Sequence, residues 1–149
     1  MKFEKFLKGC GTHGQIYKRD NGDSWLICAG VGMKIPLGVD NLLGVGEVSE
    51  KVKTVVEAII RNVDVSDKVE LTKATVPADG KANDIIRIFG DSLLVEVGIS
   101  NADYGLLEKS DSNLAELEIE DEESGINERY LLVLDYDDTV VGFITGKDF

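Results

Sequence analysis

Three side chains near the start of the sequence, Cys10, His13 and Cys28, are of the residue types that bind zinc. A structural zinc site takes four ligands, and the chain has one histidine, so a fourth ligand would have to be a carboxylate or come from a second chain. No third group can be nominated to orient a Cys–His pair for nucleophilic catalysis. We therefore expect both cysteines to be reduced, structural and metal-free, with Cys28 as a small core residue.

A second pattern with chemical potential is LLVLDYDDTVV, residues 131–141, in which an apolar strand leads into Asp135-x-Asp137-x-Thr139. It resembles the first motif of haloacid-dehalogenase-like phosphatases, in which the first Asp is the nucleophile and the second a general acid–base, with Mg²⁺ between carboxylates. The family's later Ser/Thr, Lys and acidic motifs follow over a long stretch, whereas ten residues follow Thr139. We therefore expect no phosphatase activity and a hairpin turn at residues 136–139, where Asp side chains bond to local backbone amides.

Two glycine-rich stretches, CAGVGMKIPLG and LLGVGEVSEKVK, each contain Gly-x-Gly. Neither has the Gly-x-Gly-x-x-Gly spacing or the Gly-Lys-Ser/Thr ending of phosphate-binding loops. Glu47 and Glu50 also occupy the positive end of the helix that follows, where a bound anion would lie. The sequence therefore predicts no cofactor and no enzymatic activity.

Charge is distributed unevenly along the chain, which has 16 Lys and Arg against 28 Asp and Glu, a net charge of −12. Residues 1–75 carry 11 basic and 10 acidic side chains, and residues 76–149 carry 5 and 18. A strongly acidic surface excludes a general affinity for nucleic acids or anionic membranes, because both are negatively charged. The densest acidic segment is ELEIEDEES, which contains Glu116, Glu118, Glu120, Asp121, Glu122 and Glu123.

Two interpretations of this segment follow from its alternation. Glu116, Glu118 and Glu120 fall on one face of a strand, opposite Leu117 and Ile119. Such a row of charges is typical of the exposed face of an edge strand, where it blocks edge-to-edge aggregation. Alternatively, carboxylates along an edge stand in for the phosphates of a duplex and occupy a basic groove. Both interpretations place these side chains in solvent.

The elements that position these residues are those of a single α+β domain spanning residues 1–149, since 43% of the chain is hydrophobic and no linker interrupts it. Apolar residues at three- and four-residue steps predict one long amphipathic helix near residues 48–63, with Ser49 as its N-cap. Residues 3–9 favour one or two further helical turns. No apolar run approaches the ~20 residues that span a bilayer, and the first ten residues lack the apolar core of a secretion signal.

The remaining pattern is β-rich and mostly antiparallel, typical of a sandwich or partly open barrel. Asn21-Gly22 predicts a type I′ hairpin turn between strands at 16–19 and 24–29. A Gly-rich loop with a helical turn is expected at 37–47 and a polar turn at 77–84. The acidic half, residues 69–149, is predicted to be almost all strand: 69–76, a hairpin over 84–100, and up to four more strands at 104–109, 114–120, 128–136 and 139–146.

Residues 11–44 and the phrase NADYGLLEKSD at 101–111 resemble small uncharacterised proteins of tailed phages and prophages, whose genes lie among virion structural genes. The resemblance implies a phage accessory protein without catalytic residues. One setting is a capsid decoration or head-associated protein, a small β-rich domain repeated on a shell. The other is an anti-defence protein that blocks a host immune complex or sequesters its signal.

Together these observations predict a non-catalytic virion component, or alternatively an acidic, nucleic-acid-mimicking inhibitor or a signal-sequestering binder. The expected partner is a protein, either capsid protein or further copies of this chain as a homo-oligomer, with no nucleic acid and no membrane. The expected location is the virion or the host cytoplasm. The aromatic candidates for partner binding are Tyr17, Trp25, Tyr104 and Phe149, beside the acidic residues 116–123.

Overall fold

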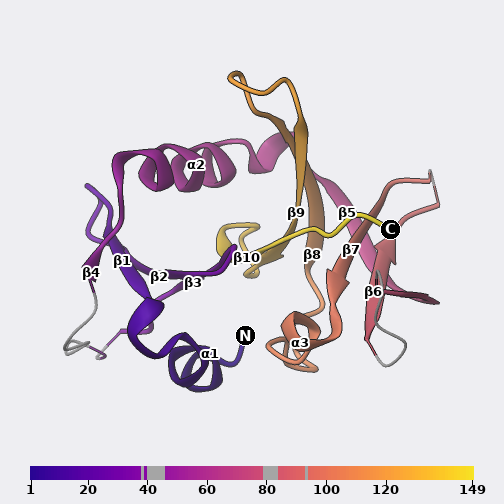
Figure 1. Ribbon diagram of the computed structural model, residues 1–149, viewed down its shortest axis with the longest axis horizontal. Helices are drawn as coiled ribbons and strands as arrows, with labels where there is room; N and C mark the ends of the chain where they lie inside the picture. The colour runs from indigo at the N-terminus through magenta and orange to yellow at the C-terminus, as the bar shows by residue number, and fades with distance from the viewer. Residues whose placement is uncertain (38, 40–45, 79–83, 93) are drawn as a thin grey trace.

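A computed structural model describes residues 1–37, 39, 46–78, 84–92 and 94–149. Over these residues the chain is α+β, with one open, mostly antiparallel sheet in the strand order β4-β1-β2-β3-β10-β9-β8-β5-β6-β7 (Figure 1). The strands are β1 Gln15–Lys18, β2 Ser24–Cys28, β3 Val31–Lys34, β4 Gly46–Glu47, β5 Asp67–Pro77, β6 Ile85–Gly90, β7 Glu96–Ser100, β8 Leu114–Glu120, β9 Asn127–Leu134 and β10 Val140–Thr145. The helices are α1 Phe3–Cys10, α2 Glu50–Arg61 and α3 Asn101–Tyr104, with 3-10 turns at Gly11–His13 and Val63–Val65. The predicted Gly-rich loop and polar turn fall mostly outside the described residues.

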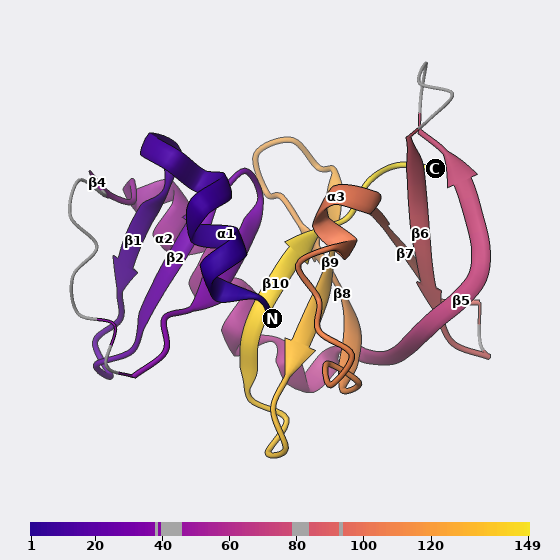
Figure 2. The same cartoon turned by 90° about the horizontal axis from the view of Figure 1, so that it is seen from below.

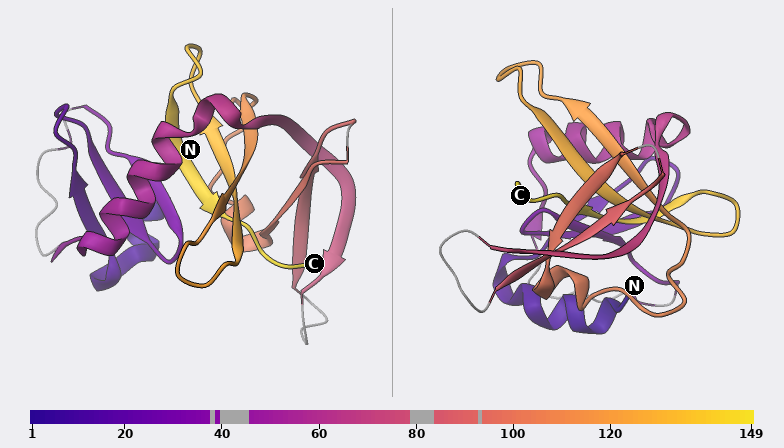
Figure 3. Two further views of the ribbon diagram at one scale, coloured as in Figure 1. Left: turned by 90° about the horizontal axis from the view of Figure 1, so that it is seen from above. Right: turned by 90° about the vertical axis from the view of Figure 1, so that its right-hand side faces the viewer.

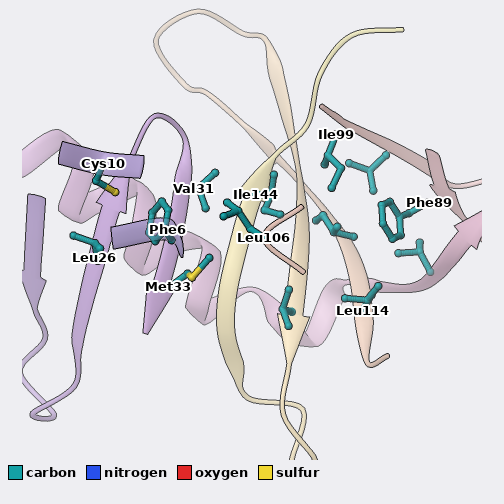
Figure 4. Packing of buried hydrophobic residues seen from close by; sticks show 14 residues of the cluster. Phe6, Cys10, Leu26, Val31, Met33, Phe89, Ile99, Leu106, Leu114 and Ile144 are labelled. Atoms are coloured by element: carbon teal, nitrogen blue, oxygen red, sulfur yellow. The ribbon is translucent and has the colours of Figure 1, made fainter. Parts of the chain in front are cut away.

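Two helices cover opposite faces of the sheet, α2 on one side and α1 on the other (Figure 1). On the α2 side, Val56 and Ile59 pack with the Trp25 and Phe143 rings, whose centroids lie 6.1 Å apart. On the α1 side, Phe6 and Cys10 pack in a cluster that continues through the middle strands to Phe89 and Ile99 of β6 and β7 (Figure 4). Figure 2, seen from this side, shows α1 and α3 in front of the sheet. The sheet therefore has a hydrophobic core on each face.

Helix α2 confirms the predicted long helix with tighter limits, 50–61 in place of 48–63. The Ser49 hydroxyl accepts the Val52 amide, so the predicted cap is present. The helix ends at Asn62, whose backbone and side-chain nitrogens both donate to the Ala58 carbonyl. Within the described residues, no helix has the length and apolar content needed to cross a membrane.

Two details of the predicted strands are wrong. Residues 104–109 are not a strand, because Ser100 caps the short helix α3 and the Leu106 and Leu107 amides then bond locally to Asp103 and Tyr104. The hairpin between β1 and β2 exists, but its turn is not type I′. Lys18 pairs with Ser24, so five residues intervene, and of these Gly22 alone has a positive φ, 93°. The tight two-residue turn lies instead at Ala29-Gly30, with φ values of 50° and 78°.

The β7 end of the sheet curls back toward its middle (Figure 3). Strand β5 is joined to β8 by three residue pairs, Val69↔Leu114, Lys68↔Ala115 and Asp67↔Glu116. On the far side of the curl, the Lys147 amide donates to the Gly98 carbonyl of β7 at 2.7 Å. Strands β5, β6 and β7 are thus held at both sides, which encloses the α1-side core.

Replacing Gly32 with alanine should destabilise the fold by about 1–3 kcal/mol. A Cβ on Gly32 would lie 2.2 Å from the Phe143 ring, which cannot withdraw because it is buried between Trp25 and Tyr130. The matched control is Gly9→Ala in α1, where a Cβ meets nothing within 4 Å and helix propensity favours alanine. Urea unfolding of both variants measures the difference, and equal stabilities would contradict this packing.

Candidate partner-binding surface

The β8–β9 hairpin extends beyond the rest of the sheet and carries most of the predicted acidic residues. Strand β8 pairs with β5 only as far as Glu116, whereas its pairing with β9 continues to Glu120↔Asn127. We call residues 117–130, the part beyond β5, the acidic arm. Figures 1 and 3 show it projecting past α2. Leu117 and Tyr130 at the base of the arm are buried in the α2-side core, so the outer residues and the tip are the parts that the arm offers to a partner.

The tip of the acidic arm is held by local hydrogen bonds. The Asp121 amide donates to the Ile126 carbonyl at 2.9 Å, and the Gly125 amide returns to the Asp121 carbonyl at 2.8 Å. The Asp121 carboxylate accepts the Glu123 amide, which contributes most to holding the pKa of Asp121 below its ordinary value. Gly125 closes the turn at a φ of 68°. The tip is therefore ordered before any partner arrives.

Four of the predicted carboxylates, those of Glu118, Glu120, Glu122 and Glu123, are exposed on the acidic arm, and Asp121 is half-buried. The Glu118 carboxylate accepts a hydrogen bond from the Asn127 side-chain amide. Among the described residues, no Lys or Arg nitrogen lies within 4.0 Å of any of these five carboxylates. The sequence analysis missed two neighbours, the exposed Glu128 and Ile126, the latter 62% exposed. Alternation along ERYLLVL points to Glu128, whereas nothing in the sequence marks Ile126.

Glu116 does not belong to this surface. Its side chain is 5% exposed, because β8 lies between β5 and β9 at this position and is not an edge strand. The prediction that the whole acidic row lies in solvent is therefore wrong at Glu116. Burial raises the pKa of its carboxyl.

The aromatic candidates are scattered and do not form one patch. Trp25 is 1% exposed and Tyr17 is buried, with its hydroxyl donating to Glu57 at 2.6 Å, so both are core residues in place of the expected surface contacts. Tyr104 is half-buried beneath the Arg87 guanidinium, 5.0 Å from the ring centroid. Phe149 is exposed, as is Tyr136, which was not among the aromatic candidates. The surface we propose below excludes Trp25 and Tyr17.

Residues 135–139 form the predicted hairpin turn between β9 and β10. One oxygen of Asp135 accepts the amides of Asp137 and Thr139, each at 2.9 Å. Asp138, at a φ of 58°, accepts from Asn113 at 2.7 Å and from Lys68 at 2.6 Å. The two carboxylates thus make the hydrogen bonds of a turn and anchor it to β5. The same Lys68 and Asn113 line a cleft of about 390 Å³ beside the turn, where their polar atoms are already committed.

The two cysteines lie together between α1 and β2. Both are free thiols, and Cys10 is buried. Burial, together with the neighbouring Cys28 thiol, raises the pKa of Cys10 to about 12, so this thiol is protonated at neutral pH. A protonated thiol is a poor nucleophile and metal ligand. Within the described ranges, no three His, Cys, Asp or Glu side chains come together in a way that could hold a metal ion.

An ion-pair network fixes α2 beside the base of the acidic arm. The Arg19 guanidinium donates two hydrogen bonds to the Glu57 carboxylate, at 2.7 and 3.3 Å, and the Tyr17 hydroxyl donates to the same carboxylate. Arg61 adds a third cationic contact at 3.3 Å. The Arg19 hydrogen bond is the largest cause that lowers the pKa of Glu57 to about 2. This pairing links strand β1 to the helix that packs on β8.

The Glu57→Gln substitution should lower the free energy of unfolding by about 2 kcal/mol at pH 7. Because the folded pKa is about 2, below the ordinary 4.5, the contribution is complete above pH 4.5 and is lost as the pH falls toward 2. The control is Glu50→Gln on the same helix, whose exposed pair with Lys53 is worth at most about 0.5 kcal/mol. Denaturant unfolding between pH 3 and 7 tests this, and a loss at Glu57 no larger than at Glu50 would refute the network.

Comparison of the chain with family models, with curated proteins and with solved structures gave no match in any of the three. The geometry of the acidic arm and the sequence resemblance are therefore the grounds for a functional proposal.

Proposed function

We propose that this protein is a non-catalytic component of a phage virion, a capsid decoration or head-associated protein that contacts capsid protein through the acidic arm. The observation that carries the proposal is a hydrogen-bonded hairpin that projects beyond the sheet, with Ile126 exposed at its tip among carboxylates that form no ion pair within the described residues. A partner that covers this tip must offer an apolar contact and a basic rim. Copies of this chain on a shell would supply a second kind of contact.

Two further observations support a binding role. The side chains with chemical potential are committed to structure, since Asp135 and Asp138 hold a turn and Cys10 is a buried thiol. The resemblance of residues 11–44 and 101–111 to small phage proteins supports the virion setting. The carboxylates and Ile126 should contribute differently to binding. Exposed ion pairs contribute ~0–1 kcal/mol each to the binding free energy and mainly speed and orient association. Burial of Ile126 against a partner contributes about 1.5–3 kcal/mol.

The alternative is an inhibitor that presents the acidic arm to a basic groove as a substitute for nucleic acid. The observation that favours it is that, within the described residues, five carboxylates of the arm have no Lys or Arg nitrogen within 4.0 Å, although Arg129 lies across the hairpin from Glu118. In that case charge, and not Ile126, dominates binding, and affinity falls steeply with salt because the contacts lie within a Debye length of about 8 Å at 0.15 M.

Mass spectrometry of gradient-purified particles should find the wild-type protein at high copy. The variant Glu118→Gln, Glu120→Gln, Asp121→Asn, Glu122→Gln should stay largely attached, since it loses only exposed pairs. Ile126→Asn should weaken attachment by more than about tenfold, because the buried apolar contact is lost. Leu37→Asn is the matched control, since Leu37 is fully exposed and follows β3, a strand that does not pair with β8 or β9.

Absence of the protein from particles, with abundance in lysate of infected cells, would overturn the virion proposal. Loss of binding in the fourfold variant, with Ile126→Asn unaffected and a steep salt dependence, would support the inhibitor in its place. The two outcomes are distinguishable because they assign the binding energy to different residues of the same arm.

A further inference from the structure

The base of the acidic arm contains a buried carboxyl group that no other feature of the fold explains. Glu116 is the one charged residue in the buried core of the described chain. Its Oε1 atom is inaccessible to solvent and has no hydrogen-bond partner. Leaving a carboxylate oxygen buried and unpaired is costly, whereas a neutral carboxylic acid in the same place costs far less. The position therefore favours the protonated form of Glu116.

Most of the charged groups around Glu116 raise the pKa of its carboxyl. Asp67 faces it across the β5–β8 pair, Glu118 lies two residues along β8, and Asp91 follows β6; all three carboxylates repel its negative charge. Arg129 of β9 is the opposing cation, and its guanidinium donates to the Glu96 carbonyl of β7 at 2.9 Å. Burial is the largest effect on the pKa of Glu116, and the net result lies above the ordinary 4.5.

Glu116 lies where two parts of the sheet are joined, so its protonation state can affect how they are held together. Glu116 is the last residue of β8 that pairs with β5, and only three residue pairs join these strands. On one side of this junction lie β5, β6 and β7, and on the other the strands that carry the acidic arm. A charge placed here acts on the three-pair link between the two parts of the sheet, which the Lys147–Gly98 hydrogen bond supplements on the far side of the curl.

We infer that the β5–β8 junction is a proton-linked joint, in which protonation of the buried Glu116 carboxyl strengthens the attachment of β5 to β8 and ionisation weakens it. The inference goes beyond the proposed function and does not depend on what the acidic arm binds. Because the proton is bound more tightly in the folded chain, the stabilisation is complete below pH 4.5 and is lost as the pH rises through the folded-state value. Between the two values the folding equilibrium constant falls by at most about tenfold per pH unit.

The direct test is a ¹³C NMR titration of the side-chain carboxyl carbons in the wild-type protein. The Glu116 resonance should titrate with a midpoint above pH 4.5. The exposed Glu120 on the same strand serves as the internal control. A Glu116 midpoint at or below 4.5 would overturn the proposal, because it would mean that the buried carboxylate is well paired. This measurement needs no variant and cannot fail through misfolding.

The second test compares Glu116→Gln with wild type in denaturant unfolding from pH 4 to pH 8. Glutamine has the shape of the protonated acid and no charge, so the variant should be more stable than wild type at pH 8 and the two should converge toward pH 4. Glu120→Gln should give no such pH-dependent difference. A Glu116→Gln variant that is less stable than wild type at pH 8 would contradict the joint, as would a difference independent of pH.

Hydrogen exchange then locates the effect. At a single pH near 7.5, amides of residues 67–69 and 114–116 should exchange more slowly in Glu116→Gln than in wild type. Amides of β2, far along the sheet, should gain less protection than those at the junction, and no more than the rise in global stability measured by unfolding accounts for. Protection that rises equally in β2 and at the junction would assign the gain to global stability and refute a local joint.

Discussion

Strands β8 and β9 are buried on both faces at the end that contains Leu114 and Leu134 and are exposed at the end that contains Glu120 and Asn127. The rest of the structure is arranged around the need to cover the buried end. Along β9, Leu131 and Val133 point into the core under α1, whereas Tyr130 and Leu132 point into the core under α2. Period-two alternation allows a strand to serve two cores only if helices or strands cover each face. Helix α1 with β6 and β7 covers one face, and α2 covers the other. Where β5 stops pairing with β8, the same hairpin becomes the acidic arm, whose base residues Leu117 and Tyr130 remain in the core under α2.

The charges on the arm also solve a problem of strand edges. From Leu117 onward β8 has no partner on the β5 side, so Glu118 and Glu120 lie on an open edge, where charge discourages pairing with another chain. Strand β5 meets the same problem beyond Val69 in a different way, with an irregularity between Leu71 and Thr75 and with Pro77 at its end. The edge-blocking interpretation of the acidic segment thus holds for its outer part, and the partner binding proposed above would add to it without replacing it.

The sequence predicts the elements better than it predicts their environment. The alternation of Trp25 with Ile27 places them on one sheet face, as in the structure, but only the arrival of α2 decides that this face is buried. In the same way, the alternation of Glu116, Glu118 and Glu120 is correct, but their exposure differs because β5 stops pairing after Glu116. The Asn21-Gly22 turn fails for a local reason: the Asn21 side chain bonds to Asp23, and the chain forms a wider loop. The periodicity of the sequence predicts neither which strands pair over long range nor where a side chain competes for backbone hydrogen bonds.

Two carboxyl groups give the two halves of the sheet opposite responses to acid. Glu57, gripped by Arg19, stabilises the attachment of α2 to β1 as long as it is ionised, so this attachment weakens only as the pH falls below 4.5. Among the described residues no Lys or Arg nitrogen lies within 4.0 Å of Glu116, and the carboxylates of Asp67, Glu118 and Asp91 act on it against Arg129 alone, so its neighbourhood tightens as the pH falls toward 4.5. The excess of carboxylates in residues 76–149 acts in the same direction as Glu116, because mild acid relieves their mutual repulsion. It follows that mild acidification tightens the base of the acidic arm before it loosens α2.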